Sequence, residues 1–374
     1  VTSVDIPDGG GKPVVQFRLT NELNQGLEGL GLSPGDIRFV LSQLSPAAPG
    51  SGASSEWQAY TTQDSNGVPN AQADYERGDD GELIDNGDGT YQYTYLNALT
   101  DYPAPPVFDA SKSHRIGLEY RGQAPNENNG LYDFVPSAGG PMDGMFTRNI
   151  VDNDTCNACH DRLEFHGGAR TDVGYCVTCH NPYSTDEDTG NTVDMKVMIH
   201  NIHAGRSDYV IVGYRGIVHD YSEVVFPQDL RNCQTCHEED DEDTPDASNW
   251  REIANRASCG TCHYDDGDPT TINNWDIQNG VHPGGFTFND DTQCFDCHGP
   301  DSTVENDDGK LVNTAAIHNL PLLEISQQFE FRIVDVANMA VGQTPTVDIS
   351  VVDPTNGDAP YDLLNDPEFT TCPG

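Results

Sequence analysis

The chain has 374 residues, more than one hydrophobic core usually organises, so we expect two or three domains. Its 18 basic residues stand against 61 acidic ones, and the formal net charge of −43 argues against nucleic acid as a partner. No stretch approaches the roughly 18 consecutive apolar residues that span a bilayer, so we expect no transmembrane segment.

Residues 1–150 contain no cysteine and alternate apolar with polar side chains, as β-strands do. The clearest runs are 15–19 and 91–95, and the second follows a turn sequence rich in Asn and Gly at 86–89. We predict an antiparallel β-sandwich or small barrel. Residues 1–5 lead almost directly into this pattern without the regions of a signal peptide, so we expect an exported chain whose targeting segment has been removed.

Residues 151–320 contain five C-x-x-C pairs, each followed directly by histidine. Two thiols three positions apart lie about one helical turn apart, which suits thioether bonds to the two vinyl groups of one haem. The adjacent histidine then reaches the iron as proximal ligand. The motifs are Cys156-Cys159-His160, Cys176-Cys179-His180, Cys233-Cys236-His237, Cys259-Cys262-His263 and Cys294-Cys297-His298.

The alternatives for a C-x-x-C pair are a zinc ribbon or a redox disulfide. Neither kind of site needs a histidine at the next position. Histidine is rare in this sequence, so its occurrence after all five pairs by chance is very improbable. We therefore predict five covalently bound c-type haems, with iron, in a loop-rich domain of short helices. The acidic run Glu238–Asp243 is interpreted as a solvated loop, with a calcium site as the alternative.

Seven histidines lie outside the motifs, and five are needed if every iron has two histidine ligands. His114 alternates with apolar residues in the cysteine-free region, which indicates a packed or surface side chain. His219 precedes an acidic and aromatic loop and is kept as a sixth candidate. The predicted distal ligands are His166, His200, His203, His282 and His318.

His200 and His203 are three residues apart on an expected helix at 193–203. Two neighbours on one turn cannot readily bind opposite faces of one haem. We therefore predict that they serve two different haems.

Residues 321–374 return to a strand pattern, in the runs 329–333 and 347–351. The segment 345–353 matches 13–21 in pattern, so we predict the start of a second β domain. Our hypothesis is that the parent gene repeats the unit of β domain and haem domain. Cys372 remains after all motif cysteines are assigned, and we predict a half-cystine whose partner lies outside this chain, with an interchain bridge or a free thiol as alternatives.

Three segments between the motifs are similar to the outer-membrane decahaem cytochromes of the OmcA/MtrC family. They are Glu164–Gly168, Met198–Gly205 and His219–Leu230. The resemblance covers nearly the whole chain and implies a β domain before a five-haem domain, a pair that is repeated in the family. It also implies transfer of respiratory electrons at the cell surface to external acceptors or partner cytochromes. The second five-haem domain has no counterpart in this sequence.

Electron transfer through bis-histidine haems is therefore the predicted function, since ligands on both faces leave no vacant position for a substrate. A multihaem reductase of a small oxyanion is the alternative and needs one open iron. A third hypothesis, compatible with the first, is a haem filament, which an inter-subunit ligand such as His114 would favour. Covalent haem attachment to an exported chain predicts a periplasmic or cell-surface location.

Overall fold

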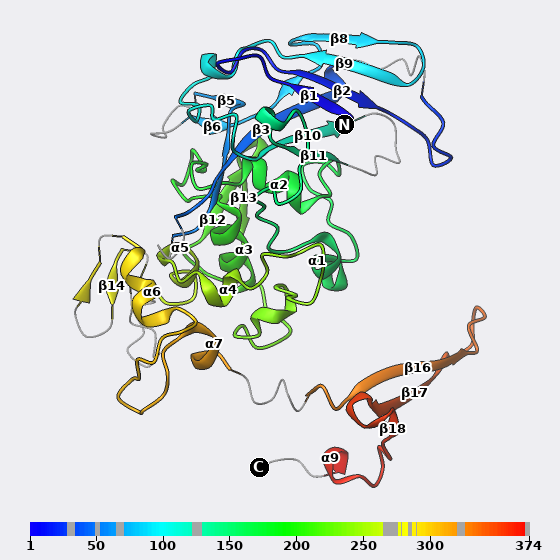
Figure 1. Ribbon diagram of the computed structural model, residues 1–374. Helices are drawn as coiled ribbons and strands as arrows, with labels where there is room; N and C mark the ends of the chain where they lie inside the picture. Colours follow the sequence, from blue (N-terminus) through cyan, green and yellow to red (C-terminus); the bar gives the residue numbers. More distant parts are fainter. Residues whose placement is uncertain are drawn as a thin grey trace. The chain divides into compact units, whose positions relative to one another are not determined.

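The computed structural model describes residues 1–27, 34–48, 53–64, 71–121, 129–264, 276–277, 279–282, 286–288, 290–319 and 326–370. The chain divides into two compact units, Val1–Ile317 and His318–Gly374 (Figure 1). The change of unit falls close to the expected change of domain after residue 320. The further division of the first unit near residue 150 remains a prediction.

The first unit begins with two antiparallel sheets (Figure 1). One has the order β1-β2-β9-β8, with the strands β1 Ser3–Asp5, β2 Val14–Arg18, β8 Glu82–Asp85 and β9 Thr90–Thr94. The other has the order β11-β10-β3-β4, with β3 Ile37–Ser45, β4 Glu56–Ala59, β10 His114–Tyr120 and β11 Gly130–Phe134. The short strand β7 (Glu76–Arg77) also pairs with β3, and β5 (Thr62–Gln63) forms a hairpin with β6 (Gln72–Ala73).

The two sheets enclose one core, so the predicted antiparallel β-sandwich is confirmed. Phe17, Tyr91 and Tyr93 come from the first sheet and Phe39 from the second, and none of them is more than 1% exposed. Phe39 stacks on Tyr93 with ring centroids 4.1 Å apart. The barrel alternative is wrong, because both sheets are open in the part of the chain that the structure describes. Complete burial of each of these aromatic side chains stabilises the folded sandwich by about 2 kcal/mol.

The rest of the first unit is loop-rich with short helices, as predicted. The helices are α1 Asn153–His160, α2 Val173–Cys179, α3 Met195–His203, α4 Asn249–Glu252, α5 Arg256–Cys259, α6 Thr292–His298 and α7 Thr314–Ile317. Two hairpins join β12 Val210–Gly213 to β13 Ile217–Asp220 and β14 Val281–His282 to β15 Phe286–Thr287. The 3-10 helices are η1 Pro34–Asp36, η2 Leu99–Asp101, η3 Pro136–Ala138, η4 Tyr214–Gly216, η5 Cys233–Thr235 and, in the second unit, η6 Pro354–Asn356. Helix α2 packs against β3, β4 and β10, which brings the second motif to the sandwich.

The second unit is a three-stranded antiparallel sheet in the order β16-β17-β18. Its strands are β16 Glu330–Ala337, β17 Thr346–Asp353 and β18 Ala359–Pro360, followed by the short helix α9 Pro367–Thr370. The predicted return of strands is confirmed, and Phe329 stacks on Tyr361 beside Phe369. Phe331 and Ile333 are 69% and 71% exposed, so this sheet buries little of its apolar surface. Cys372 lies outside the described residues.

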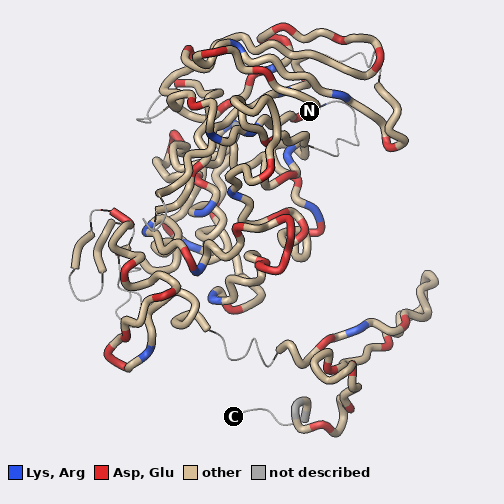
Figure 2. The backbone as a smooth tube through the Cα atoms, viewed as in Figure 1, with Lys and Arg blue, Asp and Glu red and all other residues tan. Residues whose placement is uncertain are grey.

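Asp and Glu residues are spread along both units, whereas Lys and Arg are few (Figure 2). Among the described residues, no helix is both long and apolar enough to cross a membrane.

Candidate haem-binding site

Each of the five motifs lies on or at a short helix. The first, second and fifth pairs of cysteines fall within α1, α2 and α6, the third begins in η5, and the fourth begins at the end of α5. Asp152 caps α1 by accepting a hydrogen bond of 2.9 Å from the amide of Thr155, and Asp172 caps α2 from the same position before the helix. One helical turn therefore places both thiols of a pair on the same side, as thioether bonds to one porphyrin require.

The alternative uses of the cysteines have no support in the described residues. None of the ten described cysteines forms a disulfide. In the described ranges, no group of three or more His, Cys, Asp or Glu side chains is arranged to hold a metal ion. In the acidic run, Glu239 already pairs with Arg251 at 2.7 Å and accepts from the indole of Trp250. The calcium alternative therefore gains no support.

Four of the five motif histidines face a second histidine across a constant gap. The ring centroids are 5.9 Å apart in His160–His203, 6.0 Å in His166–His180, 6.4 Å in His200–His237 and 6.0 Å in His282–His298. Nearly the same distance recurs at four separate places.

This gap fits one metal ion between two imidazoles. A bond from metal to imidazole nitrogen is about 2 Å long, and the ring centre lies about 1 Å behind that nitrogen, so the two ring centres stand about 6 Å apart. The side chains thus fit an iron that carries histidine on both faces of a haem.

The protonation of the rings also suits iron ligation. The Nδ1 atoms of His180, His203 and His298 lie 2.9, 2.9 and 2.7 Å from the carbonyl oxygens of residues 193, 199 and 312. A carbonyl only accepts, so Nδ1 carries the proton and Nε2 carries the lone pair that a metal needs. Burial lowers the pKa of His166 and His200 to about 4 and thus favours the neutral imidazole.

His200 and His203 face different motifs, in the arrangement that the helix geometry predicts. His200 faces His237 of the third motif, and His203 faces His160 of the first. His263, the histidine of the fourth motif, belongs to the first unit, whereas His318 begins the second. The role of His318 as a distal ligand therefore remains a prediction.

The two remaining histidines have other environments. His114 is completely buried in the sandwich, where Nδ1 lies 2.9 Å from the carbonyl of Lys112 and Nε2 lies 3.2 Å from the hydroxyl of Tyr60. It is a packed side chain that a second copy cannot reach, so the filament hypothesis loses its favoured ligand. The ring of His219, on β13, stacks on Tyr221 at 6.4 Å instead of facing a motif histidine.

The motifs follow one another in space in an order that differs from the sequence. In the haem-free chain, burial raises the pKa of four thiols, and a thiol of another motif raises each further. The pairs are Cys176 with Cys156, Cys156 with Cys236, Cys233 with Cys262, and Cys259 with Cys294. The motifs are therefore neighbours in the order second, first, third, fourth, fifth.

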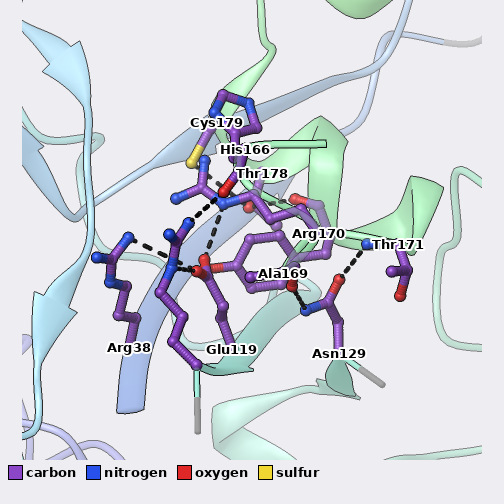
Figure 3. Close-up of polar contacts among 11 residues, drawn as sticks. Arg38, Glu119, Asn129, His166, Ala169, Arg170, Thr171, Thr178 and Cys179 are labelled. Atoms are coloured by element: carbon purple, nitrogen blue, oxygen red, sulfur yellow. Dashed lines mark hydrogen bonds and ion pairs between the residues drawn. The ribbon is translucent and has the colours of Figure 1, made fainter. Parts of the chain in front are cut away.

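Sequence reasoning missed a buried cluster of charges between the sandwich and the second motif (Figure 3). Glu119 is not exposed at all and pairs with Arg38, Arg121 and Arg170. A signal was present, because Arg115, Glu119 and Arg121 fall on one side of an otherwise apolar strand pattern. Charges at buried strand positions indicate a paired network.

Comparisons with known proteins agree with this architecture. Residues 1–141 match the family model of the OmcA-like N-terminal domain, and residues 148–308 match that of the outer membrane cytochrome MtrC/MtrF-like domains II/IV. The multiheme cytochrome MtrC of Shewanella baltica (strain OS185) is 30% identical over 318 residues, which cover 82% of this chain and 41% of that protein.

Two solved structures are similar over 96% of this chain, each at 25% identity. The outer membrane decaheme cytochrome OmcA superposes with a TM-score of 0.65 and is covered to 53%. MtrC from Shewanella baltica OS185 superposes with a TM-score of 0.59 and is covered to 50%.

Paired thiols followed by histidine, with further histidines facing them across the width of a metal ion, define a multihaem c-type cytochrome. The chain belongs to the OmcA/MtrC family of these cytochromes. It spans about half the length of the relatives that it matches.

Proposed function

We propose that this chain carries five covalently bound haems with histidine on both faces and relays respiratory electrons outside the cytoplasm to external acceptors or partner cytochromes. The four facing pairs of imidazoles are the observation that carries the proposal. The family of the chain agrees with it.

The ten motif cysteines hold the haems as thioethers, and the five motif histidines are the proximal ligands. The distal ligands are His203, His166, His200 and His282 for the first, second, third and fifth motif in turn, and His318 is the fifth predicted distal ligand. When bound, the haems would supply the change of oxidation state, and the facing histidines, already in place, would hold the iron with little rearrangement.

The order of the thiols supports a route through the second, first, third, fourth and fifth haems. Haems in this order would form one relay rather than five separate centres.

The reductase alternative requires an iron that keeps an open face. The fourth motif is the place to look for it, since the four facing pairs of histidines belong to the other motifs. We propose that this iron is also closed.

Haem counting and carbon monoxide binding test the proposal together. The purified protein should contain five haems per chain, and its reduced form should be low-spin and bind no carbon monoxide. Fewer than five haems would overturn the count. Carbon monoxide uptake of one per chain would favour the reductase, and His318→Ala would then leave that uptake unchanged.

A further inference from the structure

His166 lies in a tight turn whose backbone requires outside support. Phe165 and Arg170 close the turn by hydrogen bonds between their amides and carbonyls at 2.9 and 3.2 Å. His166 itself has a φ of +52°, and Gly167 follows with +81°. A side chain other than glycine in this left-handed region is strained and persists only where its surroundings hold it.

The β-sandwich supplies that support through two polar side chains (Figure 3). Arg121, just after β10, donates from Nη2 to the carbonyl of His166 at 2.9 Å. Asn129, just before β11, donates to the carbonyl of Ala169 and accepts from the amide of Thr171, both at 2.9 Å. The turn is thus fixed at three backbone atoms by residues remote in sequence.

Glu119 fixes the arginines that take part. Its carboxylate, completely buried on β10, accepts from Nε of Arg170 at 2.8 Å and pairs with Arg121, and Arg38 lies 3.6 Å away. Although burial raises the pKa of Glu119, Arg170 and Arg121 hold it below its usual value, so the carboxylate stays charged. It also accepts from the hydroxyl of Tyr175 on α2 at 3.2 Å.

The two segments that carry the proposed ligands of the second haem are therefore both connected to the carboxylate of Glu119. The turn provides the distal histidine, and α2 provides the two thiols and leads into the proximal His180. His166 and Cys179 both lie beside this arginine cluster (Figure 3), and the ring of His166 stands 6.0 Å from that of His180. Separate supports would let the two ligands drift apart, whereas a shared one fixes the gap between them.

We propose that Glu119 and Asn129 are positioning residues that make the β-sandwich part of the second haem's coordination. They hold the turn of His166 at the distance from His180 that an iron between them requires. The inference rests on the proposed function, in which His166 is the distal ligand of that haem. Residues of the β-sandwich thus set the geometry of the electron-transfer site.

Two variants and a matched control test the inference on the complete holoprotein. Glu119→Gln removes the charge that orients the arginines, and Asn129→Ala removes both hydrogen bonds of its carboxamide. The control Asp133→Asn weakens a different link to α2, because Asp133 pairs with Arg115 at 2.6 Å and Arg115 donates to the carbonyl of Gly174. All three variants weaken the attachment of the sandwich, but the control leaves the turn of His166 untouched.

The readouts are the high-spin fraction and the carbon monoxide bound per reduced chain. We expect Glu119→Gln and Asn129→Ala each to free one face of a single haem, so that carbon monoxide uptake rises from zero toward one per chain. The control Asp133→Asn should bind no carbon monoxide. If Glu119→Gln loses haem or fails to fold, Asn129→Ala decides the question, because it leaves the buried charges paired.

His166→Ala separates failure of the inference from failure of the proposed function. If it opens no haem, His166 is not a ligand and the proposed function is wrong at that site. If it opens one haem while Asn129→Ala stays closed, the positioning role is overturned. An equal opening in Asp133→Asn would also overturn it, because general loosening would then be the cause.

Discussion

His200 and His203 lie one turn apart on α3, yet their rings face histidines of two different motifs. His200 stands 6.4 Å from His237, and His203 stands 5.9 Å from His160. In the proposed ligation, one short helix would carry the distal ligands of the first and third haems. Such a shared helix would fix the two haems relative to each other, which suits rapid electron transfer between them.

Replacing either histidine with alanine should open one haem, and the two haems should differ. The iron left with one axial ligand becomes high-spin and binds carbon monoxide when reduced. We expect one carbon monoxide per chain for His200→Ala or His203→Ala, and two for the double variant. Uptake of only one by the double variant would contradict the arrangement. His219→Ala serves as control and should bind none.

The stability of the sandwich should fall in acid because of His114. Burial lowers its pKa from 6.5 to about 4, against the opposing effects of the hydrogen bond to Lys112 and the charge of Asp109. Below pH 6.5 His114 is protonated in the unfolded chain but stays neutral in the folded chain. The free energy of unfolding therefore declines as the pH falls toward 4. The expected loss approaches 3 kcal/mol, on the order of 1.4 kcal/mol per pH unit.

Chemical denaturation at a series of pH values measures this dependence. His114→Gln should be less stable at neutral pH but should show a flatter profile between pH 4 and 6.5. His219→Gln changes a surface ring and should keep the profile of the parent chain. An unchanged profile for His114→Gln would show that other groups govern the acid sensitivity.

The carboxylate of Glu76 should be a main support of the sandwich. It accepts from the hydroxyls of Tyr93 at 2.7 Å and Tyr102, and from the amide of Leu96 at 2.8 Å. Glu76→Leu leaves the hydroxyl of Tyr102 and the amide of Leu96 without this acceptor, at a cost of about 1–3 kcal/mol each, whereas the hydroxyl of Tyr93 keeps the carbonyl of Arg77 at 2.9 Å. Unfolding should therefore become easier by about 2–5 kcal/mol.

Urea denaturation followed by tryptophan fluorescence checks this change, since Trp57 is buried in the sandwich. The exposed strand residue Glu82 provides the control. Glu82→Leu should alter the free energy of unfolding by less than about 0.5 kcal/mol. Equal effects of the two substitutions would rule out the buried network as a special support.

The net charge of −43 should govern encounters with small electron acceptors. The reduced protein should transfer electrons to a cationic complex faster at low salt, because screening shortens from about 10 Å at 0.1 M to about 3 Å at 1 M. An anionic complex of similar potential should show the opposite trend. Stopped-flow traces at several ionic strengths measure both, and parallel trends would contradict electrostatic steering.

The sequence by itself determined the attachment chemistry and the layout of secondary structure. A C-x-x-C-H motif carries its meaning within one helical turn, as in Cys156-Cys159-His160, so no distant contact is needed to recognise it. The strands at 15–19 and 347–351 were visible for the same reason, because alternation is a local property of the backbone. The choice between sandwich and barrel was not local and stayed open.

Only the tertiary structure decided which side chains meet. The partner of His180 is His166, fourteen residues earlier, whereas that of His160 is His203, forty-three residues later. The alternation around His114 predicted a packed or surface side chain, but only the fold shows that Tyr60 is its partner, and only the fold links Glu119 to Tyr175 beside the second motif. Such pairings depend on how the chain folds back on itself, because distant contacts are selected by the packing of the whole unit and leave no spacing in the sequence.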